Sequence, residues 1–150
     1  MRRPINPEAD LAETSANAEL QQTFALLLPI RRQRLSRSER AQREQERALR
    51  EANSQREAAE MQLEVCQQRY HQLRDSFAAG VQPQQRLMQG LNKERTANDA
   101  RQGQQRQLEQ CQQRQTEQQQ RLAQAQQETL ARQRELEKLE YLIGESEVLQ

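Results

Sequence analysis

The stretch from Ala78 to Gln84 holds the only proline between Ile30 and the end of the chain. Gly80 suits the left-handed conformation that ends many helices, and Val81 can fold back on the last turn. Pro83 suits the start of a new helix, because its missing N–H has no bonding partner there. So short a connection, of about four residues, favours two antiparallel helices. The break therefore predicts a helical hairpin whose turn lies between Ala78 and Gln84.

The composition leaves few other fold classes. Hydrophobic residues make up 33% of the 150 residues, aromatic residues 3%, and there is no Trp, which is too little for a globular core of this length. A disordered chain and a coiled coil remain. The chain carries 30 Gln and 21 Arg but only 4 Gly and 4 Pro, and Gln and Arg are good helix formers. A low-complexity Gln-rich segment would lack sustained heptads, so the periodicity decides.

A seven-residue repeat of apolar side chains begins at Ile30 and continues to residue 79, which we take as the first helix. Between Leu49 and Phe77 the alternating spacing of three and four residues is unbroken, and Arg56 is its one polar member. The expected a positions are Leu35, Gln42, Leu49, Arg56, Leu63, Tyr70 and Phe77, and the expected d positions are Ser38, Gln45, Ala52, Ala59, Cys66 and Leu73. Such a seam predicts a helix that packs against a partner helix.

The second helix, expected over residues 84–143 after a tip at 80–83, keeps one heptad frame but has a more polar seam. Its a positions are Leu87, Glu94, Arg101, Leu108, Gln115, Leu122, Thr129, Leu136 and Ile143, and its d positions are Gly90, Ala97, Gln104, Cys111, Gln118, Ala125, Arg132 and Leu139. Polar seam residues lower stability while specifying register. Gly90 and Gly103 each weaken the helix by about 1 kcal/mol relative to Ala, so its first third should be soft. Gly144 is expected to end it, which leaves 144–150 as a tail.

Charge favours the antiparallel arrangement. Residues 31–50 hold eight Arg and three Glu, a balance of +5, whereas residues 135–150 hold five Glu and one Lys, a balance of −4. A hairpin lays these opposite blocks beside each other. Each exposed pair contributes little free energy, but the blocks select the orientation.

Residues 1–29 form a separate region in this interpretation. The acidic residues and prolines at its start indicate a mobile N-terminal extension. A short helix from about Ala18 to Leu28 is one possibility, with Leu20, Phe24 and either Leu27 or Leu28 on its apolar face. The alternative is a segment that orders only on a partner. Pro29 is expected to end or kink any such helix.

The sequence contains no recognisable set of catalytic residues. His71 is the single histidine, so neither a triad nor a multi-histidine metal site can form. Cys66 and Cys111 are expected to be free thiols that pack as small apolar residues. The longest apolar run, Phe24–Leu28, is too short to cross a membrane. We therefore expect an intracellular chain that is not an enzyme, binds no metal or cofactor and inserts into no membrane.

Two surfaces are candidate interaction sites. The arginines that open the first helix are one of them: Arg31, Arg32, Arg34, Arg37 and Arg40. They could be a solvated face, a nucleic-acid site or a protein-docking surface; the net charge of +1 and the lack of interleaved aromatics disfavour nucleic acid. The tip is the other, with Tyr70, Phe77, Val81, Leu87, Met88 and Leu91. These could form a contact patch or simply pack the tip together.

The arginine-rich opening resembles the stalk proteins of bacterial type III secretion systems, the YscO or FliJ-like family. The resemblance rests on the stretch Leu28–Ala41, with Ile30-Arg31-Arg32-Gln33-Arg34 near its start, and on the chain length and the mid-chain hairpin. It covers residues 26 to 145, and the N-terminal extension departs from the family pattern. Membership would imply a non-enzymatic central stalk, similar to the rotor coiled coil of rotary ATPases.

The resemblance also implies partners and a location. In such stalks the paired termini sit in the hexameric export ATPase and the hairpin tip reaches the export gate, on the cytoplasmic side of the inner membrane. Carried over, Arg31 to Arg40 and residues near Leu136 to Ile143 would face the ATPase, and Tyr70 to Leu91 would face the gate. Some members also bind secretion chaperones. A generic cytosolic coiled-coil scaffold is the alternative, and a nucleic-acid-binding hairpin comes third.

Overall fold

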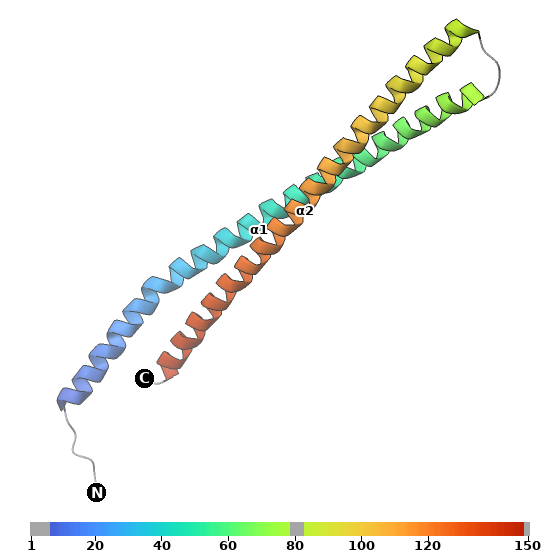
Figure 1. The fold of residues 1–150 in the computed structure, drawn as a ribbon. Coiled ribbons are helices and arrows are strands. Elements are labelled where there is room, and N and C mark those ends of the chain that lie inside the picture. The colour runs from blue at the N-terminus through green and yellow to red at the C-terminus, as the bar shows by residue number, and fades with distance from the viewer. Residues whose placement is uncertain (1–6, 79–82, 149–150) are drawn as a thin grey trace. The chain divides into compact units, whose positions relative to one another are not determined.

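Two long helices packed against each other make up the computed structural model, which describes residues 7–78 and 83–148. Helix α1 spans Pro7–Ala78 and helix α2 spans Gln84–Val148. Their contacts divide the chain into two compact units. The terminal unit joins the described residues up to 44 to those from 123 onward, and the tip unit comprises the described residues between 45 and 122. Within each unit α1 and α2 lie side by side and run in opposite directions (Figure 1), which confirms the antiparallel pairing.

The burial pattern follows the expected heptad frame. Every a and d position expected in the two helices is buried or half-buried, with the single exception of Leu87, which is 43% exposed. The most deeply buried apolar side chains include the small residues Ala52, Ala59, Ala97 and Cys111 and one larger residue, Leu139. Small seam residues let the helix axes approach closely. The seam is therefore a narrow apolar line rather than a broad core.

Amide side chains bridge the two helices inside the tip unit. Gln115 Nε2 donates to Asn53 Oδ1 at 2.6 Å, and Gln118 Nε2 donates to Gln45 Oε1. These bonds satisfy polar groups that the seam would otherwise bury unpaired. Ion pairs between described residues include those of Arg56 with Glu60 and of Arg132 with Glu128 and Glu135, and each of these lies within a single helix. Register is therefore held by amide hydrogen bonds as well as by apolar contacts.

The described helix ends agree with a turn between Ala78 and Gln84, because α1 ends at Ala78 and α2 begins at Gln84. Residue 79, where the first helix was expected to end, lies outside the described residues. Pro83 O accepts the first helical hydrogen bond of α2, from Leu87 N at 3.0 Å. Gly80 and Val81, for which a helix cap was predicted, lie outside the described residues.

Two expected helix ends are wrong. Helix α1 does not start at Ile30 but runs from Pro7 through Pro29, and α2 passes Gly144 to reach Val148. The heptad frame continues upstream of Pro29, where Phe24 and Leu28 take d and a positions and are half-buried. Pro29 itself is exposed, so water can solvate the carbonyl group that its missing N–H leaves unpaired. Packing on both sides of each breaker thus outweighs the local preference to stop.

Two glycines in α2 stand in different surroundings. A Cβ at position 90 would overlap the ring of Phe77, which fills the space over Gly90. At Gly103 an added Cβ would meet nothing within 4 Å. Gly90 therefore serves packing at the tip, whereas Gly103 only costs helix propensity.

This difference predicts opposite responses to alanine. Gly103→Ala should raise the free energy of unfolding by about 1 kcal/mol, because only propensity changes. Gly90→Ala should bring no such gain, since the Phe77 ring must swing out of its place, and amide exchange around residues 73–77 should quicken. Urea unfolding and hydrogen exchange measure both. An equal gain from the two substitutions would contradict the role given to Gly90.

The hairpin is testable by pulsed electron spin resonance. Ser54 and Gln113 are exposed and belong to different helices of the tip unit. Spin labels at these two positions should lie roughly 30 Å apart or closer, given helix spacings of 8–10 Å. A single continuous helix would separate them by about 90 Å. Dilution with unlabelled protein should leave the distance unchanged; a signal lost on dilution would mean pairing between chains instead.

Candidate interaction surfaces

The basic cluster at the start of the expected first helix divides into one bound arginine and four exposed ones. Arg31 occupies a seam position, is half-buried, and its Nη1 donates to the backbone oxygen of Glu135 at 2.8 Å. Arg32, Arg34, Arg37 and Arg40 are exposed and lie off the seam. Arg31 thus takes part in the pairing of α1 with α2, and its role in docking stays a prediction. The other four remain available to a partner.

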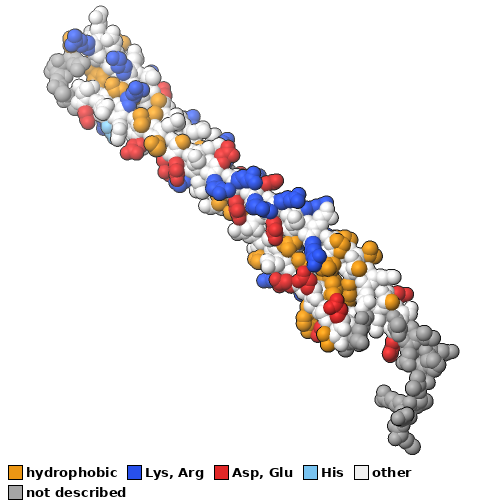
Figure 2. Space-filling view, turned by 180° about the vertical axis from the view of Figure 1, so that it is seen from behind, with side chains coloured by type: hydrophobic (Ala, Val, Ile, Leu, Met, Phe, Trp, Pro, Cys, Tyr) orange, Lys and Arg blue, Asp and Glu red, His pale blue; other side chains and the backbone are white. Residues whose placement is uncertain are grey.

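An apolar surface that the sequence reasoning missed lies in the terminal unit. Leu26, Tyr141 and Val148 are 70%, 65% and 85% exposed and fall at f positions, opposite the seam. Such positions are normally polar on a solvated helix. The exposed large apolar residues of this unit include Leu20, Leu26, Ile30, Leu130, Tyr141, Leu142 and Val148. Figure 2 shows apolar side chains gathered on one face of this unit, next to basic ones.

This surface had a signal in the sequence. Continuing the heptad frame past Pro29 puts Leu26 at f and Leu27 at g, which leaves more apolar residues than one seam can bury. The assumption that Pro29 ends the helix concealed this excess. The structure shows the same excess on α2, where Tyr141 and Leu142 follow the buried Leu139.

The predicted tip residues differ in burial. Tyr70 is half-buried on the seam, with the guanidinium carbon of Arg101 4.9 Å from its ring centre. Phe77 is half-buried over Gly90. Leu87, Met88 and Leu91 are exposed, and Met88 and Leu91 line a shallow groove of about 460 Å³ together with Tyr70. Val81 lies outside the described residues. The structure therefore brings Tyr70, Met88 and Leu91 together in one groove and places Phe77 over Gly90.

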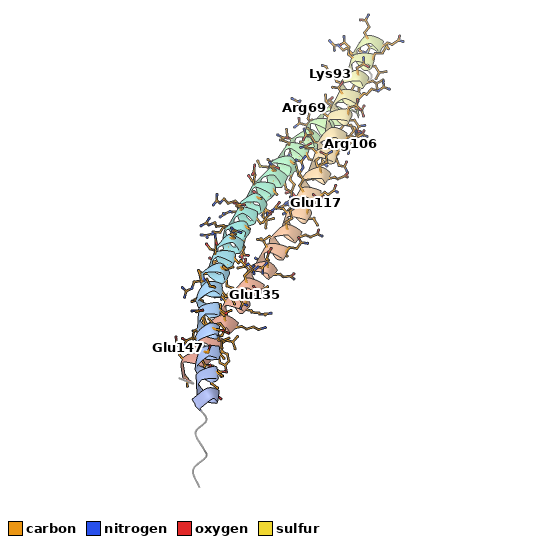
Figure 3. All side chains as sticks on the ribbon, turned by 90° about the vertical axis from the view of Figure 1, so that its left-hand side faces the viewer. Arg69, Lys93, Arg106, Glu117, Glu135 and Glu147 are labelled. Carbon is orange, nitrogen blue, oxygen red and sulfur yellow. The ribbon has the colours of Figure 1, made fainter. Side chains whose placement is uncertain are left out.

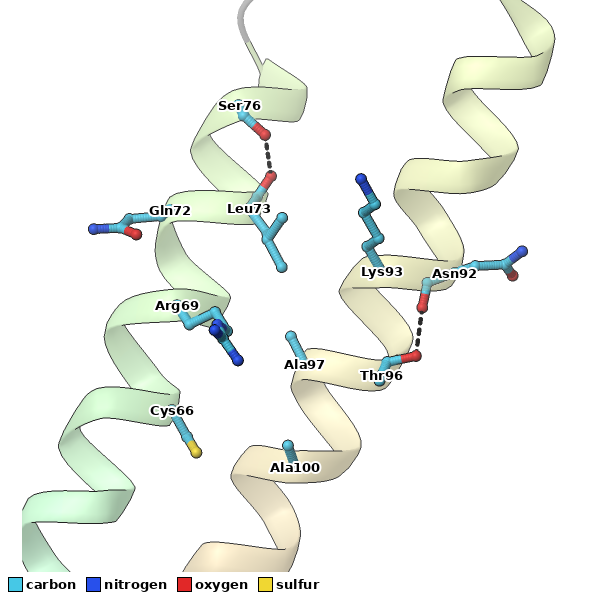
Figure 4. Close-up of a pocket in the computed structure, with 10 residues that line it drawn as sticks. All are labelled: Cys66, Arg69, Gln72, Leu73, Ser76, Asn92, Lys93, Thr96, Ala97 and Ala100. Carbon is cyan, nitrogen blue, oxygen red and sulfur yellow. Dashed lines mark hydrogen bonds between the residues drawn. The ribbon is translucent and has the colours of Figure 1, made fainter.

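A larger groove opens between the helices of the tip unit. It encloses about 720 Å³ and is bordered by Cys66 and Leu73 from α1 and by Ala97 and Ala100 from α2. Figure 4 shows these four side chains on the facing sides of the two helices, with Arg69 between Cys66 and Leu73 on α1 and Lys93 near Ala97 on α2. Sequence reasoning did not predict this groove, although the run of small residues at Ala97 and Ala100 could have indicated it.

The terminal unit also shows one perturbed titration. Tyr141 Oη donates to Glu145 Oε1 at 2.6 Å, and this bond to a carboxylate raises the pKa of Tyr141. Figure 3 locates Glu135 and Glu147 on the same stretch of α2. The raised pKa extends the pH range over which Tyr141 stays protonated and donates this hydrogen bond on an exposed helix face.

Groups that could carry chemistry remain dispersed. Within residues 7–78 and 83–148, no three His, Cys, Asp or Glu side chains gather in a geometry that could hold a metal ion. The rings of Tyr70 and His71 pack edge to face, 5.8 Å apart. Cys66 is half-buried and Cys111 buried, and both are free thiols, as predicted. No helix in the described part of the chain is long and apolar enough to cross a membrane.

The role of Arg31 predicts a difference between neighbouring arginines. Arg31→Ala removes a bond between the helices and should lower the free energy of unfolding by about 1 kcal/mol. Arg32→Ala, the matched control on the exposed side, should change it by less than about 0.5 kcal/mol. Urea unfolding followed by circular dichroism compares them. Equal effects would mean that the Arg31 contact contributes nothing to pairing.

Comparison with known proteins adds no relative from which a role could be transferred. No family model, curated protein or solved structure matches the chain.

Proposed function

We propose that this protein is a non-enzymatic interaction protein, the central stalk of a bacterial type III secretion system. In this role the terminal unit docks on the hexameric export ATPase in the cytoplasm, and the tip unit contacts the export gate. Secretion chaperones are further partners. The proposal joins the observed antiparallel hairpin to the resemblance of the Leu28–Ala41 stretch to the stalk family.

The observation that carries the proposal is the apolar surface of the terminal unit. Both helices expose large apolar side chains at positions that point away from the seam, including Leu26 on α1 and Tyr141 on α2. A helix that is apolar on more than its packed side is normally covered. A stalk end inserted in a ring of subunits is covered on several sides at once, which suits this distribution.

The exposed arginines supply the second half of the argument. Arg32, Arg34, Arg37 and Arg40 lie off the seam on the same unit. Arginine is favoured at interfaces because its planar fork binds carboxylates at two points. An acidic surface on the partner would therefore be drawn to the terminal unit, and an apolar contact would then hold it.

Charge reversal tests this docking. Replacing Arg32, Arg34, Arg37 and Arg40 by Glu should abolish binding to the hexameric export ATPase of the same organism and the stimulation of ATP hydrolysis. Arg31 is left in place because it joins the two helices. Binding of the wild type should weaken steeply as ionic strength rises. Interferometry with the immobilised ATPase measures both effects.

A matched variant controls for net charge. Arg95, Arg106, Arg114 and Arg121 are exposed and belong to the tip unit, so their replacement by Glu changes the charge equally elsewhere. This control should bind the ATPase as the wild type does, and circular dichroism should show unchanged helicity in both variants. If the wild type fails to bind any export ATPase, or binds equally well after the first reversal, the stalk role is wrong and a generic scaffold remains.

A further inference from the structure

The groove between the helices of the tip unit exists because of small side chains. Ser76, Ala97 and Ala100 line it where longer residues would close the gap between α1 and α2. The floor is apolar, formed by Cys66 and Leu73 beside the two alanines (Figure 4). Its residues span Cys66–Ser76 on α1, which corresponds to about 15 Å of helix. A third helix could therefore lie in it over two to three turns.

Two cations flank this apolar floor. Arg69 belongs to α1 and Lys93 to α2, and both line the groove (Figures 3 and 4). Neither side chain forms a hydrogen bond or ion pair with any residue that the structure describes. None of the ten lining residues is acidic. The groove is thus positively charged at its sides and has no carboxylate of its own to offset that charge.

The heptad pattern places further basic residues on the same flank of the hairpin as the groove. Arg69, Arg86 and Lys93 take g positions in the heptad frame, beside the seam on one flank of the hairpin. In the tip unit the g positions of α2 continue with Ala100, Gln107, Arg114 and Arg121. No g position of either helix between residues 45 and 122 is acidic, although the formal net charge of the chain is only +1. The cations therefore gather on one flank by placement, not through an excess of basic residues.

We propose that this groove binds an acidic amphipathic helix of a partner protein. The apolar stripe of such a helix would pack on Leu73, Ala97 and Ala100, and carboxylates at its borders would meet Arg69 and Lys93. Helices that bind in grooves use this arrangement of spaced apolar anchors. Charge at the rim selects the partner and its orientation. Nucleic acid fits less well, because the floor offers no aromatic ring for a base to stack on.

This site is independent of the proposed stalk role. It lies in the tip unit and on residues that the ATPase-docking surface does not include. It also differs from the shallow groove of Tyr70, Met88 and Leu91. Failure of ATPase binding would therefore leave it untouched, and its own failure would leave the stalk proposal standing.

Cys66 provides a reporter inside the groove. In full-length protein carrying Cys111→Ala, the one remaining thiol lines the site. The probe is a synthetic helix of about four turns with a leucine stripe bordered by glutamates. Its binding should slow the reaction of Cys66 with a thiol reagent in a saturable way. The same peptide with lysine in place of every glutamate should give no protection.

Variants of the groove then separate charge from shape. Arg69→Glu with Lys93→Glu should weaken binding of the acidic peptide by roughly tenfold for each lost contact. The matched control, Arg47→Glu with Arg50→Glu, reverses two exposed arginines of the tip unit outside the groove and should bind normally. Ala100→Phe fills the groove without a change of charge and should also abolish binding. Because that change alters access to Cys66, its effect is measured by the anisotropy of a labelled peptide.

Three results would overturn the proposal. Equal protection of Cys66 by the lysine peptide would mean that the groove binds apolar helices without selecting for acidic ones. Unchanged affinity after reversal of Arg69 and Lys93 would place the peptide elsewhere. Stronger protection of Cys66 by a single-stranded oligonucleotide than by the acidic peptide would identify a nucleic-acid site instead. Circular dichroism of each variant confirms that the helices remain, so that lost binding reports on the groove.

Discussion

The rest of this structure depends on one narrow seam in which α1 and α2 meet. Its buried positions include the small residues Ala52, Ala59 and Ala97, and many of its other positions are polar. Gln115 and Gln118 find partners across the seam. Arg56 Nε and Gln104 Oε1 are buried without one among the described residues, which costs stability. The hairpin is thus held together by fit and register more than by buried apolar area.

A seam of this kind makes the two units different in character. The terminal unit has more large apolar residues than the seam can bury. Leu139 lies in the seam and is only 1% exposed, whereas Tyr141 lies outside the seam and is mostly exposed to solvent. In the tip unit the shortage of large side chains leaves a gap, which becomes the groove beside Leu73 and Ala97. An excess of large apolar side chains in the terminal unit and a shortage of them in the tip unit therefore create the two surfaces that a partner could bind.

Both surfaces combine apolar side chains with exposed arginine or lysine side chains. Arg34 and Arg37 accompany the exposed apolar residues of the terminal unit, and Arg69 and Lys93 border the groove of the tip unit. Charge speeds and orients an encounter, whereas apolar contact supplies most of the affinity. The tip unit and the terminal unit therefore each present a recognition surface of their own.

The sequence by itself determined the helical class, the position of the turn and the seam, because heptad spacing and the Gly80–Pro83 pair act locally along the chain. It did not determine where the helices end: Pro29 and Gly144 read as breakers, yet packing against the other helix carries α1 and α2 through them. Nor could it separate Arg31 from Arg32, since only the position of the Glu135 carbonyl does so. The groove likewise needed the tertiary structure, because it forms only where Cys66 and Ala97, 31 positions apart, face each other.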